Sequence, residues 1–352
     1  MKKEYIIPIF VPHRGCPNDC SFCNQRKISG QIKDVTSDDV INTINYYLSN
    51  FKDDSKYVEV AFFGGSFTGI DKEKQIELLE AANTFIKDGK VGGIRISTRP
   101  DYINKEILKF LKKYHVRTIE LGVQSANNYV LDKCKRGHTF EDVKKASKMI
   151  RWRGFTLGHQ MMVGLPESTM LDEISTAKEL IKLKPKMVRI YPVLVIKDTQ
   201  LERDFLENEY IPITIEQAVE RTKEILKLFN RKKINVIRIG LQNTEEINSP
   251  EIEGSQVVAG PYHPAFRQLV ESSVWYDCLA DKIKKLNSNV RQVEIIANDI
   301  NINNIIGHKR ENIEKIKDFY DVDIIVKINN DILPGKFEIN IIKTHFDFIE
   351  NK

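Results

Sequence analysis

Three cysteines crowd into eight residues near the start of the chain: Cys16, Cys20 and Cys23, in the spacing C-x3-C-x2-C. Thiolates at such close spacing are ligands for iron or zinc. On one short loop they can hold three irons of a [4Fe–4S] cube and leave the fourth iron open to a ligand that is not protein. The spacing therefore predicts an iron–sulfur cluster with one open iron.

The alternative is a structural zinc site. Such a site takes four protein ligands, usually from paired C-x2-C units. The remaining cysteines, Cys134 and Cys278, stand alone and form no second pair, so His13 would have to supply the fourth ligand. The sequence favours iron and leaves zinc as the alternative interpretation.

The elements that position this loop are short β-rich runs separated by amphipathic helical stretches, which is typical of a parallel sheet closed or partly closed into a barrel. Several helices have start signals, such as Thr36 and Thr139, each followed by acidic residues. A further apolar run, Asn235–Gly240, follows a long helical stretch. The six principal runs are Tyr5–Val11, Tyr57–Phe63, Gly93–Thr98, Thr118–Val123, Leu157–Val163 and Met187–Val193.

Polar residues or glycines stand where these strands finish, as the ligand-lined mouth of a barrel requires. A glycine pair at a strand end lets backbone approach a ligand closely. For any single position the alternative is an ordinary turn. The motifs are GGSFTG from Gly64, STRPD from Ser97, ELGVQS from Glu120, GLP from Gly164 and YPV from Tyr191.

With an aromatic residue before its last cysteine and a strand–helix barrel behind it, the cysteine motif resembles that of the radical S-adenosylmethionine superfamily. Over roughly residues 5–240 the strand-end motifs resemble the radical domain of the Elongator catalytic subunit. They include Arg136-Gly137-His138-Thr139 after the fourth strand. The cysteine spacing is shorter than in that subunit, and we expect no acetyltransferase domain, so acetyl-CoA chemistry is not expected.

The resemblance implies a [4Fe–4S] cluster on the three cysteines and S-adenosylmethionine bound at the barrel mouth. Tyr191 and His159 are expected to point toward the mouth and to handle substrate or protons; the alternative is that both are structural. The residues that the resemblance assigns to S-adenosylmethionine are Phe22 against the adenine, Gly64, Gly65 and Ser66 at the amino group, Ser97 and Arg99 at the ribose or carboxylate, and Gln124 and Gly164 in the pocket.

From about residue 290 the pattern changes to strand, helix, strand, strand, which resembles a KH module, a fold that clamps single-stranded nucleic acid with a G-x-x-G loop. The loop is Gly307-His308-Lys309-Arg310, with arginine in place of the second glycine. The alternative is a small α/β dimerisation or capping domain with a solvated basic turn. We expect a partial (β/α)6 barrel over 1–240, a connecting or capping segment over 241–289, and a KH-like α/β domain over 290–352.

Three functions remain open: a radical enzyme that modifies a base in tRNA or rRNA, a radical enzyme on a small molecule similar to anaerobic coproporphyrinogen oxidase, and a non-catalytic cluster-bearing haem or metal chaperone. Either enzyme needs a reductase, flavodoxin or ferredoxin as electron donor. Methylthiolation is disfavoured because only Cys134 and Cys278 remain, and we expect both to be buried structural thiols.

The net charge of +5 permits a polyanionic partner. Without a long apolar segment, we expect a cytoplasmic protein and no membrane partner.

Overall fold

The computed structural model describes residues 4–11, 20–24, 34–51, 57–286 and 288–344. The chain forms two compact units. Met1–Arg221 and Leu228–Pro264 make up the first, which we call the barrel unit; Thr222–Lys227 and Ala265–Lys352 make up the second, the carboxyl-terminal unit. The long helix α9 (Ile215–Arg231) contributes residues to both.

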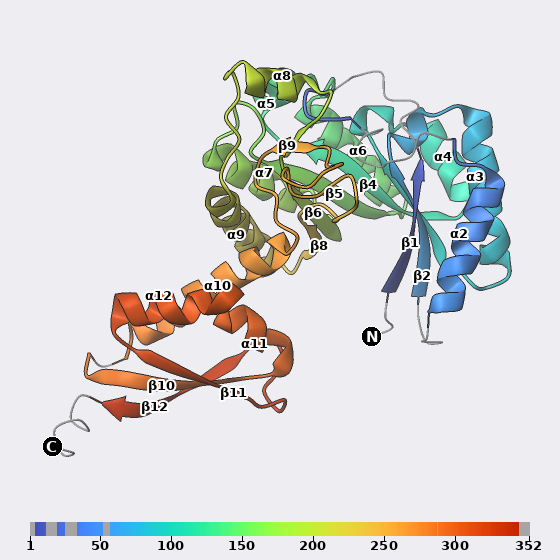
Figure 1. Ribbon diagram of the computed structural model, residues 1–352. Coiled ribbons are helices and arrows are strands. Elements are labelled where there is room, and N and C mark those ends of the chain that lie inside the picture. Colours follow the sequence, from blue (N-terminus) through green and yellow to red (C-terminus); the bar gives the residue numbers. More distant parts are fainter. Residues whose placement is uncertain (1–3, 12–19, 25–33, 52–56, 287, 345–352) are drawn as a thin grey trace. The chain divides into compact units, whose positions relative to one another are not determined.

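Seven parallel strands form the sheet of the barrel unit, in the order β1-β2-β3-β4-β5-β6-β8 (Figure 1). Neighbours in the sheet are consecutive along the chain, apart from one two-residue strand that belongs to a separate sheet, and helices connect them, as in a barrel that is partly closed. The strands are β1 (Glu4–Val11), β2 (Tyr57–Gly64), β3 (Gly93–Thr98), β4 (Val116–Gln124), β5 (Thr156–Val163), β6 (Met187–Pro192) and β8 (Asn235–Ile239), with β7 (Val195–Ile196) paired to β9 (Val257–Ala259).

The connecting helices cover the outer face of this sheet (Figure 1). Capping boxes start several of them, among them those after Thr36, Thr139 and Thr169, where each threonine hydroxyl and an aspartate three residues later satisfy backbone N–H groups. The helices are α2 (Ser37–Asn50), α3 (Lys72–Lys87), α4 (Lys105–Lys113), α5 (Asn128–Lys133), α6 (Phe140–Trp152), α7 (Met170–Lys182) and α8 (Gln200–Leu206), with short 3-10 turns η1 (Phe67–Gly69) and η2 (Pro100–Tyr102).

This architecture confirms the predicted α/β barrel. All six residues of β3 are buried, as expected of a parallel strand covered on both faces. The structure adds one strand to the expected six, because the apolar run after α9 becomes β8 and pairs with β6.

The carboxyl-terminal unit has a three-stranded sheet, ordered β11-β10-β12, in which β10 is parallel to β11 and antiparallel to β12. Leu279, Ile295, Ile305 and Ile316 share its core, one from each helix and one from the central strand. Two helices separate the first two strands, where the sequence predicted one. The elements are α10 (Phe266–Ile283), β10 (Val290–Ala297), α11 (Asp299–Ile306), η3 (His308–Arg310), α12 (Glu311–Tyr320), β11 (Asp323–Ile328) and β12 (Phe337–Thr344).

Candidate active site

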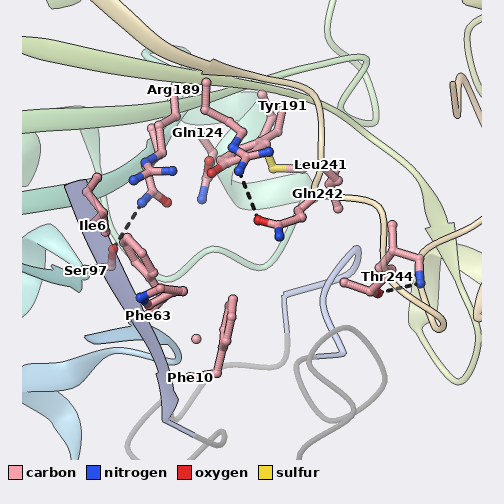
Figure 2. Close-up of a pocket in the computed structure, with 16 residues that line it drawn as sticks. Ile6, Phe10, Phe63, Ser97, Gln124, Arg189, Tyr191, Leu241, Gln242 and Thr244 are labelled. Atoms are coloured by element: carbon pink, nitrogen blue, oxygen red, sulfur yellow. Dashed lines mark hydrogen bonds between the residues drawn. The ribbon is translucent and has the colours of Figure 1, made fainter. Parts of the chain in front are cut away.

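A cavity of about 390 Å3 lies on the inner face of the barrel sheet (Figure 2). Every strand of the sheet contributes to its lining, and the segment after β8 adds Leu241 and Gln242. Gln160 and Met162 both reach it from β5 because alternate side chains of a strand point to the same face. Four of the predicted site residues line this cavity: Gly64, Ser97, Gln124 and Tyr191.

Gly64 ends β2 beside the end of β1. Its φ is +108°, and a Cβ atom there would lie 2.3 Å from the carbonyl oxygen of Val11. Gly65 donates its backbone N–H to the same oxygen at 3.4 Å. Since Val11 leads directly into the cysteine loop, the glycine turn lies beside the entry to that loop.

Ser66 and Arg99 belong to one hydrogen-bonded group at the ends of β2 and β3. The Oγ atom of Ser66 lies 2.8 Å from Oγ1 of Thr98 and accepts the backbone N–H of Arg99 at 3.1 Å. The guanidinium of Arg99 is buried and donates from Nη2 to Oδ2 of Asp101 at 2.9 Å. The serine hydroxyl thus holds the two strand ends together.

Cys20 and Cys23 lie on a single turn, in which the Cys23 N–H donates to the Cys20 carbonyl at 3.0 Å. Cys16 lies outside the described residues. Two backbone hydrogen bonds fasten this turn to the barrel unit: the Ser21 N–H donates to the Cys134 carbonyl at 3.0 Å, and the Ser21 carbonyl accepts the Leu201 N–H at 2.8 Å. The end of α5 and the start of α8 therefore position the cysteines.

Arg136 joins this turn to β4. Its Nη1 donates to the Sγ atom of Cys20 at 3.3 Å, and its Nη2 donates to the carbonyl oxygen of Gly122 at 2.9 Å. Only 9% of the residue is exposed, so little solvent screens its charge.

The donor set fits an iron–sulfur cluster. Two thiols share one turn, and a guanidinium beside one sulfur favours the negative charge that thiolates bring to a cluster. Within the described ranges, no group of three His, Cys, Asp or Glu side chains is placed to hold a metal ion. The predicted third ligand, Cys16, lies beyond them.

Cys134 lies beside the turn and is poorly suited to bind a metal. Burial raises the pKa of its thiol to about 12, and a thiol that keeps its proton is a poor metal ligand.

Phe22, predicted to lie against an adenine, is buried with Cys134 in an apolar cluster that includes Leu165 and Val193. The prediction that Cys278 is buried is wrong, because this residue lies on the exposed face of α10.

Gln124 reaches the cavity from a strained backbone. It ends β4 with φ +68°, after a register shift in the pairing of β4 with β5. This left-handed conformation costs a residue other than glycine about 1–2 kcal/mol. Such strain is common where a chain aims a side chain into a ligand site.

Gly164 directly follows the last residue of β5 and does not line the cavity. Two side chains hold it: its N–H donates to Oε1 of Glu173 at 2.7 Å, and its carbonyl accepts the Tyr210 hydroxyl at 2.7 Å. Its φ is +85°, and a Cβ atom would lie 2.8 Å from Ile213. Arg221 pairs with Glu173 at 3.1 Å. We call this arrangement the Gly164 clamp.

A row of buried charges crosses the inner sheet. Arg95 pairs with Glu59 at 2.6 Å and with Glu120 at 2.8 Å, and Arg189 pairs with Glu120 at 2.6 Å. Burial opposes ionisation of Glu120, but Arg189 and Arg95 together keep the pKa of its carboxyl below the ordinary value. The row ends at Tyr191, whose phenol hydrogen-bonds with Arg189 and whose pKa is raised by burial.

His159 does not face the cavity, contrary to the expectation. It is 0% exposed, and its Nε2 lies 2.9 Å from Oγ of Ser147 on α6. The reason is the two-residue period of β5: Gln160 and Met162 face inward, so His159 faces the helices. Burial lowers the pKa of this imidazole to about 3, which keeps it neutral.

The turn Gly307–Arg310 joins α11 to α12 in the carboxyl-terminal unit. Lys309 and Arg310 are exposed and have φ of +49° and +68°. Gly307 has φ +83°, and a Cβ atom there would lie 2.9 Å from the backbone nitrogen of Asn312. Packing against the start of α12 therefore explains this glycine.

Sequence reasoning assigned no role to several residues of the site. Arg136 appeared only within a motif, and the buried charges were overlooked. A signal existed for the latter, since ionisable residues interrupt otherwise apolar strands. The overlooked residues are Glu59, Arg95, Glu120, Arg136, Gln160, Arg189, Arg238 and Gln242.

Comparison with known proteins matches residues 10–181 to the Radical SAM superfamily and residues 185–275 to the Radical_SAM C-terminal domain. A tRNA uridine(34) acetyltransferase of Methanocaldococcus jannaschii is 39% identical over 128 residues, which are 36% of this chain and 24% of that protein. An uncharacterized protein of the same organism is 30% identical over 224 residues, 62% of this chain and 65% of its own length.

Elongator complex protein 3 of Saccharomyces cerevisiae is 29% identical over 49% of this chain and 34% of its own length. Among solved structures, the Elp3 of Methanocaldococcus infernus superimposes with a TM-score of 0.60 at 21% identity, over 80% of this chain and 64% of that one. The chain thus spans about a quarter of the length of the two Methanocaldococcus tRNA uridine(34) acetyltransferases that it matches. No helix in the described part of the chain is long and apolar enough to cross a membrane.

Proposed function

Because the chain belongs to the radical S-adenosylmethionine superfamily, whose members use a [4Fe–4S] cluster and S-adenosylmethionine, we propose that it cleaves this cofactor reductively in order to modify a base in tRNA or rRNA. When bound, the cluster and cofactor supply a 5′-deoxyadenosyl radical. Cys16, Cys20 and Cys23 hold the cluster. A reductase, flavodoxin or ferredoxin donates the electron.

The observation that supports this assignment most strongly is the convergence of four predicted residues on one cavity. Gly64, Ser97, Gln124 and Tyr191 come from four different strands and all line it. The glycine turn offers backbone groups to the methionine part of the cofactor, and Gln124 reaches in from its strained backbone. Ser66 and Arg99 do not line the cavity, but the hydrogen bond between them holds together the ends of β2 and β3 that do.

Tyr191 is the residue we place beside the substrate. Its pKa is raised by burial, so the phenol stays protonated near neutral pH, and Arg189 orients it. A protonated, oriented phenol can donate a hydrogen bond or a proton to a substrate in the cavity. His159 has no place in this scheme because it faces the helices.

The RNA substrate is supported by two independent observations. Relatives 39% and 34% identical in the matched region are tRNA uridine(34) acetyltransferases. In addition, the turn from Gly307 to Arg310 exposes Lys309 and Arg310. Adjacent exposed cations are suited to phosphate.

A second candidate is a radical enzyme acting on a small molecule. The cavity volume of about 390 Å3 supports it, because pockets for small ligands range from about 300 to 1,000 Å3. Methylthiolation is not supported, because it requires three further cysteines for a second cluster and only Cys134, which is buried, and Cys278, which is exposed, remain.

The test of the chemistry is anaerobic reconstitution with iron and sulfide, reduction with dithionite, and detection of 5′-deoxyadenosine after S-adenosylmethionine is added. Wild type and Cys278→Ala should both form it, whereas Cys20→Ala and Cys23→Ala should lose the cluster and the product. A well-formed cluster that yields no 5′-deoxyadenosine contradicts the proposal.

The test of the substrate is mass spectrometry of nucleosides from tRNA and rRNA of a strain that lacks the gene. We expect one modified nucleoside to disappear and to return when the gene is restored. An unchanged nucleoside profile would favour the small-molecule candidate.

A further inference from the structure

Arg136 occupies a position that the proposed chemistry does not explain. It neither lines the cavity nor belongs to the row of buried charges. Instead, its guanidinium donates to the sulfur of Cys20 and to the backbone of β4. Two anchor points on one planar group fix its orientation as well as its position.

The chain makes room for this group. Gly122 lies under the guanidinium, and a Cβ atom at that position would be 2.6 Å from Nη2 of Arg136. Glycine at 122 therefore allows the guanidinium to reach the carbonyl oxygen of the same residue. Since the contacting atom is the far end of a flexible side chain, a methyl group at 122 would displace the guanidinium before it disturbed the strand.

The positive charge of Arg136 affects how readily the cluster is reduced. A [4Fe–4S] cluster in its ordinary oxidised state has a core charge of about +2, so three thiolates make it an anion, and reduction by one electron adds negative charge. A buried cation that donates a hydrogen bond to a cluster sulfur favours the more negative state, because the interior screens charge weakly. Hydrogen bonds to the sulfurs are among the factors that set the potential of such clusters.

We infer that Arg136 is a positioning residue that raises the reduction potential of the cluster, through its hydrogen bond to Cys20, and that Gly122 holds it in place. This inference rests on the proposed cluster site. It adds a residue outside the cysteine motif that determines how easily the cluster accepts its electron.

Three variants separate the charge from its position. Arg136→Gln removes the charge, Arg136→Lys keeps a charge without the two-pronged geometry, and Gly122→Ala displaces the unaltered arginine. The matched control is Arg117→Gln, which removes an exposed positive charge near the other end of the same strand, five residues or about 16 Å from Gly122.

The experiment is a redox titration of each reconstituted protein without S-adenosylmethionine, followed by the electron paramagnetic resonance signal of the reduced cluster. We expect reduction to become at least tenfold less favourable in Arg136→Gln, a fall of about 59 mV for a one-electron couple. Gly122→Ala should shift in the same direction, Arg136→Lys should shift less, and Arg117→Gln should match wild type.

Circular dichroism and the iron and sulfide content of each variant show whether it folds and holds an intact cluster. Equal potentials in wild type, Arg136→Gln and Gly122→Ala, with intact clusters, would overturn the inference. If wild type itself assembles no cluster, the underlying proposal fails instead. Should Arg136→Gln fail to fold, Gly122→Ala still decides the question, because it retains every polar group.

Discussion

Gly64 shows how one residue couples the two halves of the site. Two features of this position require glycine. Its φ is +108°, and its α-carbon lies against the carbonyl of Val11, the last residue before the cysteine loop. A side chain there must move either β2 or the end of β1. The first movement disturbs the cavity and the second disturbs the loop that leads to the cluster.

We therefore predict that Gly64→Ala weakens both stability and cofactor binding. The matched control is Gly89→Ala, because Gly89 also has a positive φ of +70° but has no neighbouring atom within 4 Å of its hypothetical Cβ. The control should lose about 1 kcal/mol of unfolding free energy from backbone strain. Gly64→Ala should lose clearly more and bind S-adenosylmethionine more weakly, as measured by urea unfolding and calorimetry; equal losses would contradict this explanation.

Tyr191 and His159 make a second residue-scale test, because they lie on opposite faces of the sheet. Tyr191→Phe keeps the ring and removes the hydroxyl. We predict that it lowers the rate at which the substrate is modified about 100-fold, with little change in stability. This factor is the low end of what a positioned proton donor contributes.

His159→Gln should show the opposite pattern. It breaks the buried hydrogen bond with Ser147 and should cost about 1–3 kcal/mol of stability without lowering the turnover of the folded protein. Product yield and thermal unfolding, measured on both variants, distinguish the two roles. A catalytic defect in the folded histidine variant would refute the assignment.

At the scale of elements, the Gly164 clamp connects the end of β5 to α7. Burial raises the pKa of the Glu173 carboxyl from 4.5 to about 7, although the Gly164 N–H and Arg221 oppose that shift. The folded protein therefore binds this proton more tightly than the unfolded chain does. Its contribution to stability is complete below pH 4.5 and is lost as the pH rises to about 7.

We predict that the unfolding free energy of wild type falls, relative to Glu173→Gln, between about pH 5 and pH 7, by at most about 1.4 kcal/mol per pH unit. Glutamine keeps an oxygen that can accept the Gly164 N–H and removes the titration. Urea unfolding at several pH values measures the difference. Parallel pH profiles would show that Glu173 stays ionised in the folded protein.

At the scale of the whole molecule, the chain combines a barrel unit that contains the cavity with a carboxyl-terminal unit that exposes the basic turn. If the turn binds RNA phosphates, the double variant Lys309→Gln/Arg310→Gln should weaken RNA binding at low salt. The slope of log affinity against log salt should also become shallower by about 1 to 2.

The control for this test is Lys284→Gln/Lys285→Gln, which removes two exposed positive charges just after α10 in the same unit. It should leave the slope of log affinity against log salt unchanged. That result would show that a general loss of positive charge does not cause the effect of the double variant in the turn. Fluorescence anisotropy with a labelled tRNA, from about 50 to 200 mM salt, measures both variants. A shallower slope in both would indicate non-specific attraction only.

The sequence alone determined the order of the principal strands, the cysteine spacing and the family. Each depends on residues close together in the chain: apolar alternation over a strand, a capping threonine with its aspartate, or thiols on one loop. The strand-end residues Gly64, Ser97, Gln124 and Tyr191 were also predictable, because parallel strands bring their carboxyl ends to the same edge. The division of the chain at residues 240 and 290 stays a prediction.

Tertiary structure decided which side chains meet. Arg136 contacts Cys20 across 116 positions of sequence, and no local pattern encodes such a contact. The direction of His159 depended on the phase of β5, which a shift of one residue reverses, and the exposure of Cys278 depended on which face of α10 packs inward. The cysteine spacing therefore predicted a cluster, whereas the packing of β4, α5 and the cysteine turn set the electrostatic environment of its sulfur.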